Sequence, residues 1–171
     1  MSAHDHSRSS AEIRSDLGHP VIDADAHAIE VTPVLLDYIE ATGGSGMVDR
    51  YRAFPVKRQF RLSDDDAYWT ADSGSWVWPT RNTLDRATAT LPKLYADRLD
   101  EFGIDFAIVY PSEGLFGPQI GDDDLRQTVC RAYNTYIAES YRPYADRMTP
   151  AAVIPCHAPD EAVDELRFAV H

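Results

Sequence analysis

The sequence predicts an α/β protein with a parallel sheet. Three short runs rich in apolar residues, at residues 21–27, 104–110 and 148–154, have the length of β-strands. Segments with the 3.6-residue period of amphipathic helices separate these runs and follow the last one. Strands that alternate with helices favour right-handed crossover connections, which place successive strands parallel to one another.

The composition is that of an ordinary globular protein. Of the 171 residues 44% are hydrophobic, which is enough to bury a core. The chain has 16 Lys and Arg against 28 Asp and Glu, and the resulting net charge of -12 repels phosphate backbones and anionic membranes. We therefore expect neither nucleic acid nor a membrane as a partner. Cys130 and Cys156 lie in different expected elements without C-x-x-C spacing, which predicts reduced thiols in a cytoplasmic protein.

The amino-terminal segment differs from the rest of the chain. Residues 1–18 are polar and contain no apolar run, so they match neither a signal peptide nor a membrane anchor. We expect a disordered leader here, followed by one domain over residues 19–171.

The first strand ends in polar residues at every second position. Because successive side chains of a strand point to opposite faces, Asp23, Asp25 and His27 are predicted to share one face. A carboxylate and an imidazole two residues apart can reach the same divalent ion. Strand-end residues that only form hydrogen bonds are the simpler interpretation. Ligands of parallel α/β proteins bind at the carboxyl ends of strands, however, so Asp25 and His27 are candidate metal ligands.

A long insertion is expected between the first strand and the second. A helix is predicted to start with Thr32 as its N-cap and to stop at Gly43, and residues 40–90 then show no sustained period. Long connections of this kind are usually lids, binding loops or assembly surfaces. Trp78 and Arg81 are candidate substrate-binding residues, the arginine for a carboxylate. An aromatic cluster beneath the loop or a subunit contact would explain the tryptophan equally well, and such an arginine more often simply pairs at the surface.

The second half of the chain is more regular. A helical stripe precedes Gly103, which suits a left-handed helix terminus, and the next apolar run ends at Pro111. The acidic residues 122–124 are interpreted as the solvated start of a helix that Pro143 ends. His157 follows the third strand, where active-site groups collect, but a loop histidine without such a role is the simpler interpretation. The long helix is predicted to bury one stripe of residues: Leu125, Val129, Ala132, Tyr133, Tyr136 and Ile137.

Three segments of the chain, taken in sequence order, resemble segments of a known protein family. No glycine-rich nucleotide-binding loop follows any expected strand, which favours a barrel over a doubly wound nucleotide-binding fold. Residues 21–27 with Glu30, residues 99–111, and residues 153–155 leading into residues 160–166 resemble the amidohydrolase superfamily. The similarity is to its aminocarboxymuconate-semialdehyde decarboxylase-like branch, amidohydrolase family 2, and it covers most of residues 20–171.

The resemblance implies a fold, an activity and a metal. Members are (β/α)8 TIM barrels that bind one divalent ion, commonly zinc or manganese, and hydrolyse or non-oxidatively decarboxylate small carboxylic or aromatic substrates. Asp25 and His27 would be the first-strand ligands. Asp25 departs from the common His-x-His pattern, and its oxygen makes manganese as plausible as zinc. Glu30 would lie in the second coordination shell, where it orients His27 without binding the metal itself, although capping of the helix entry explains it equally well.

The length departs from the family. A complete barrel takes about 250 residues, whereas this chain supplies about three of the eight βα units. The remaining ligands and the catalytic acid or base would lie beyond His171, so we expect the N-terminal part of an enzyme. Three strands alone would leave sheet edges exposed, which favours a homo-oligomer. The alternative is a non-catalytic half-barrel that self-associates or binds a partner.

Overall fold

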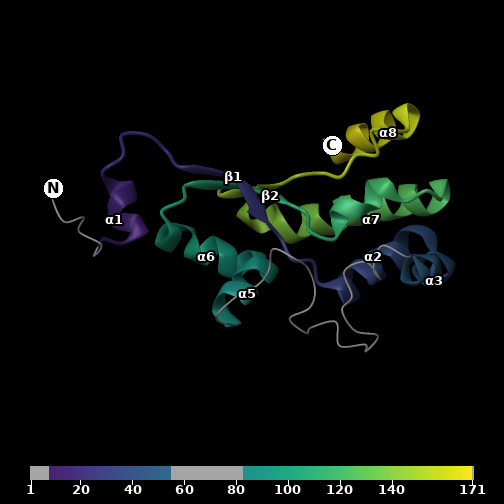
Figure 1. Ribbon diagram of the computed structural model, residues 1–171, viewed down its shortest axis with the longest axis horizontal. Helices are drawn as coiled ribbons and strands as arrows, with labels where there is room; N and C mark the ends of the chain where they lie inside the picture. The colour runs from purple at the N-terminus through teal and green to yellow at the C-terminus, as the bar shows by residue number, and fades with distance from the viewer. Residues whose placement is uncertain (1–7, 55–82, 171) are drawn as a thin grey trace, which may run out of the picture.

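The computed structural model describes residues 8–54 and 83–170, which form a mixed α/β structure with a small parallel sheet (Figure 1). The sheet has three strands in the order β1-β2-β3, and both neighbouring pairs are parallel. The predicted α/β class and parallel sheet are therefore confirmed. The strands are shorter than the apolar runs that predicted them: β1 (Ile22–His27), β2 (Phe106–Tyr110) and β3 (Met148–Pro150).

Helices make up most of the described structure. The long helix α7 lies between α8 on one side and α2 with α3 on the other (Figure 1). The helices and 3-10 turns in chain order are α1 (Ser10–Ser15), α2 (Thr32–Gly43), α3 (Ser45–Ala53), α5 (Thr83–Thr90), α6 (Pro92–Phe102), η1 (Gly114–Gln119), α7 (Asp123–Tyr141), η2 (Arg142–Tyr144) and α8 (Pro159–Ala169).

Local signals account for several helix ends. Gly103 closes α6 with a φ of 72°, in the left-handed region that favours glycine. Asp122 is the N-cap of α7 and its side chain accepts a hydrogen bond from the Leu125 N–H. The prediction for the start of α2 was wrong by one position. Val31 is the N-cap there, and Thr32 lies inside the helix, where its hydroxyl donates to Glu113 instead.

The described part of the amino-terminal leader is folded, which corrects the expectation of disorder for residues 8–18. Ser9 and Glu12 form a capping box that starts α1. Arg14 then forms an ion pair with Asp105, and its Nη2 lies 2.7 Å from the Asp105 Oδ1. This polar segment therefore forms a helix that docks on the rest of the chain. Residues 1–7 lie outside the described residues.

The expected insertion over residues 40–90 contains further helices. Its first part continues α2 and forms α3, and its last part forms α5. Residues 55–82 lie outside the described residues, and with them Trp78 and Arg81.

The core lies on one face of the sheet. Ala107 and Val109 of β2 are fully buried beneath the helices, and the whole predicted stripe of α7 is buried with them. The alternate β2 residues, from Phe106 to Tyr110, are only half-buried, and Ile22 of β1 is 57% exposed. Helices thus cover one face of this sheet much more completely than the other.

Two further predictions concern chemistry and membranes. Cys130 is buried and Cys156 is exposed, and both are free thiols, as predicted. No helix among residues 8–54 and 83–170 is long and apolar enough to cross a membrane.

Candidate metal site at the end of the first strand

A β-bulge changes the predicted pattern of β1. Asp23 pairs with Ala107 and Ala26 pairs with Val109, so a step of three residues on β1 lies opposite a step of two on β2. The extra residue breaks the strict alternation of faces. Asp23 therefore shares the helix-covered face with Ala26. There it interacts with Tyr95 of α6, whose pKa is raised to about 12 by burial and by the nearby Asp23 carboxylate. The prediction that Asp23 shares a face with His27 was wrong.

Asp25 and His27 do lie together after the bulge. The Asp25 Oδ1 is 3.8 Å from the His27 Nε2, which is too far for a hydrogen bond. Two atoms that each bind one metal at about 2.0–2.2 Å lie about 3–3.5 Å apart, so a small side-chain rotation would bring this pair to that spacing. The Asp25 side chain is 95% exposed and that of His27 is 23% exposed, so an ion from solvent can reach the carboxylate.

The second ring nitrogen of His27 has a defined partner. Its Nδ1 lies 3.1 Å from the carbonyl oxygen of Pro111, just after β2. Because a carbonyl only accepts, Nδ1 carries the proton in this contact, and the neutral ring has its lone pair on Nε2. Metal-binding histidines usually donate their other N–H in this way. The donor chemistry of Asp25 and His27 therefore fits a divalent metal.

Glu30 lies beyond the strand and is 4% exposed. Its carboxylate accepts three backbone hydrogen bonds: Oε1 from Ser112 and Gly114, both at 3.0 Å, and Oε2 from Glu113 at 2.9 Å. Burial raises the pKa of Glu30 to about 7, while the N–H donors oppose that rise. Glu30 thus holds the segment after β2 and the start of η1, whereas the sequence suggested a role at its own helix entry or at His27.

The segment after β2 has two further supports. The Thr32 hydroxyl donates to the Glu113 carboxylate at 3.0 Å. The ring of Tyr133 packs so closely on Gly114 that a Cβ there would lie 2.5 Å from the Tyr133 Cε2, so only glycine fits. Tyr133 is fully buried, and its hydroxyl has no hydrogen-bond partner among the described residues. Sequence analysis missed this arrangement, for which the adjacent Ser112, Glu113 and Gly114 gave no recognisable motif.

One other candidate, His157, lies among the described residues. Trp78 and Arg81 lie outside the described residues, and His157 is an exposed residue of the turn that precedes α8. Among the described residues, no group of three or more His, Cys, Asp and Glu side chains could hold a metal ion. The described site is therefore a pair of candidate ligands, Asp25 and His27, with an ordered hydrogen bond behind the histidine.

Comparison with known proteins adds no assignment. No protein-family model matches the chain, and no curated protein matches it in sequence.

Proposed function

We propose that this chain contributes the first βα units of an amidohydrolase-related (β/α)8 barrel, in which Asp25 and His27 bind one divalent metal, Zn²⁺ or Mn²⁺. The observation that carries the proposal is the geometry at the end of β1. A carboxylate and an imidazole lie 3.8 Å apart, and the histidine donates its other N–H to the Pro111 carbonyl.

The order of the strands supports the barrel. β1, β2 and β3 are adjacent in chain order and parallel, as successive barrel strands must be, whereas doubly wound sheets reverse their order part-way. The difference in helix coverage between the two faces of the sheet supports the barrel as well. In a barrel the helices cover the outer face and functional groups lie at the carboxyl ends of the strands. His27 pairs with Tyr110, on the face of β2 that the helices leave half-buried.

The proposed activity is hydrolysis or non-oxidative decarboxylation of a small carboxylic or aromatic substrate. A bound metal would supply polarisation of a substrate oxygen or a water with a pKa of about 7. His27 contributes a neutral nitrogen with a fixed tautomer, and Asp25 contributes a negative charge that favours oxygen-preferring ions. Under this proposal, the remaining ligands and the catalytic acid or base come from strands beyond β3.

A metal titration tests the site. Zn²⁺ and Mn²⁺ are added separately to the ¹⁵N-labelled chain, and binding is followed by calorimetry and by the NMR signals of His27. We expect changes at His27 that D25A abolishes, and a calorimetric binding signal that both D25A and H27A abolish. Asp23→Ala is the matched control, because Asp23 belongs to the same strand but lies on the opposite face near Tyr95. The proposal would be contradicted if the wild-type His27 signals did not change with either metal, or if D23A lost as much metal binding as D25A.

The alternative function is a non-catalytic half-barrel that self-associates or binds a partner. The observation that favours it is the incompletely covered sheet face, with Ile22 57% exposed. Analytical ultracentrifugation with and without I22K separates the two proposals. A self-associating module dissociates on this substitution, whereas metal binding at Asp25 and His27 persists in I22K if the site exists.

A further inference from the structure

One peptide group lies between the Glu30 carboxylate and the His27 ring. The carbonyl oxygen of Pro111 faces the His27 Nδ1 at 3.1 Å. The N–H of Ser112 belongs to the same peptide bond and donates to the Glu30 Oε1 at 3.0 Å. The two hydrogen bonds therefore use opposite ends of a single planar unit.

The planarity of this unit links the two side chains mechanically. Carbonyl and N–H of a trans peptide point in opposite directions and cannot rotate independently. Once the Glu30 carboxylate fixes the N–H of Ser112, the direction of the Pro111 carbonyl is fixed as well. The bonds from Glu113 and Gly114 to the same carboxylate hold it at the correct angle. Glu30 can thus control His27 without touching it.

The same unit links them electrically. A carboxylate that accepts from a peptide N–H polarises the group and makes its carbonyl a stronger acceptor. A stronger acceptor at Pro111 favours the His27 tautomer with the proton on Nδ1. That tautomer leaves the lone pair on Nε2, which faces Asp25.

We propose that Glu30 is a positioning residue that acts through the Pro111–Ser112 peptide to hold His27 in its Nδ1–H tautomer. In metalloproteins a carboxylate often binds the histidine N–H directly. Here a buried carboxylate acts one peptide further away. The claim about the tautomer stands on the hydrogen bonds alone, and the claim that it serves metal binding rests on the proposed function.

The test compares E30Q with a matched control in the full chain. A glutamine side chain is neutral, so it polarises the Ser112 N–H less than the carboxylate does. It also turns an NH₂ group toward the N–H of Glu113, so one of the three backbone hydrogen bonds that orient this segment is lost. The control is E165Q, because Glu165 is 5% exposed and accepts hydrogen bonds from two side chains of α7, those of Arg131 and Asn134. Long-range ¹H–¹⁵N NMR of labelled histidine reports the tautomer of His27 directly.

We expect the Nδ1–H tautomer in the wild type and in E165Q, and a mixture of tautomers in E30Q. The affinity of His27 for added Zn²⁺ should fall about tenfold to a hundredfold in E30Q alone. A wild-type ring protonated on Nε2, or an E30Q ring with the wild-type tautomer, overturns the inference. If E30Q does not fold, E30D replaces it. Its shorter side chain should give a smaller tautomer shift, and an unchanged tautomer in folded E30D overturns the inference equally.

The two proposals can fail separately. If the His27 tautomer shifts in E30Q but the wild-type chain does not bind Zn²⁺, the role of Glu30 is supported and the metal site is overturned. Zn²⁺ binding at His27 that is equal in wild type and E30Q, with an unchanged tautomer, supports the metal site and overturns the role of Glu30.

Discussion

Two buried glutamates illustrate how partners decide the role of a residue. Glu165 of α8 accepts from Arg131 and Asn134, side chains of the neighbouring helix α7. Glu30 accepts from three consecutive backbone N–H groups instead. Both side chains are about equally buried. The first joins two helices, whereas the second fixes the backbone that faces the candidate metal site.

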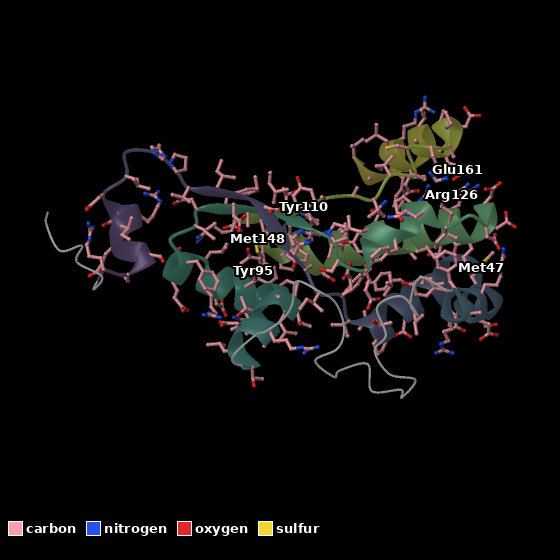
Figure 2. All side chains as sticks on the ribbon, viewed as in Figure 1. Met47, Tyr95, Tyr110, Arg126, Met148 and Glu161 are labelled. Carbon is pink, nitrogen blue, oxygen red and sulfur yellow. The ribbon has the colours of Figure 1, made fainter. Side chains whose placement is uncertain are left out.

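The largest effect should come from the helix interface to which Glu165 belongs. Arg126 is 3% exposed and binds Glu161, Asp123 and the Ile120 carbonyl, and Figure 2 shows Arg126 beside Glu161 between α7 and α8. Arg126→Ala leaves Glu161 and this carbonyl without their cation. We expect a loss of about 3 kcal/mol in the free energy of unfolding, measured with urea. A loss below about 1 kcal/mol would show that this interface contributes little.

The next largest effect should be the difference in stability between variants of the two glutamates. E30Q sets an NH₂ group against the Glu113 N–H, leaving a buried donor unsatisfied, and should lower the free energy of unfolding by about 2 kcal/mol. E165Q retains an acceptor for Asn134 and loses only its charged bond to the part-exposed Arg131, so we expect about 1 kcal/mol. Urea midpoints of both variants check this order. Equal losses would remove the contrast between backbone and side-chain partners.

The pH dependence of stability sharpens the contrast further. Burial raises the pKa of Glu30 from an ordinary value near 4.5 to about 7, so between these values the folded chain binds more protons than the unfolded chain. The free energy of unfolding should therefore fall as pH rises from about 4.5 to 7. We expect the drop between pH 5 and pH 8 to be smaller in E30Q than in wild type, as measured by urea unfolding. An identical drop in both would contradict the raised pKa.

The smallest effect should come from α1, which a part-buried ion pair between Arg14 and Asp105 helps to dock. The hydrogen bond from Arg14, followed by that from the Val21 N–H, lowers the pKa of Asp105 to about 2. Its stabilisation is complete above pH 4 and is lost as pH falls toward 2. We expect faster amide exchange in α1 over this range, and D105N should have the same local effect at neutral pH. D97N, which alters an exposed pair with Lys93, should leave α1 unchanged.

Local sequence was sufficient wherever a structural element depends on its own residues. The stripe from Leu125 to Ile137 predicted the buried face of α7, because helical period and hydrophobicity act within a few turns. Gly103 predicted a left-handed helix end, which its φ of 72° confirms. The alternation of strands and helices predicted the parallel sheet. The docked helix α1 was missed, because its ion pair joins Arg14 to Asp105, 91 residues away.

By itself the sequence determined the class of the fold, the order of its elements, and Asp25 with His27 as a candidate pair. Only the tertiary structure decided that a bulge separates Asp23 from this pair and that Glu30 reaches the peptide behind His27. The physical reason is distance along the chain. Periods and caps act over a few residues, whereas Glu30 and His27 meet partners more than 80 residues away, which only the pairing of β1 with β2 brings near.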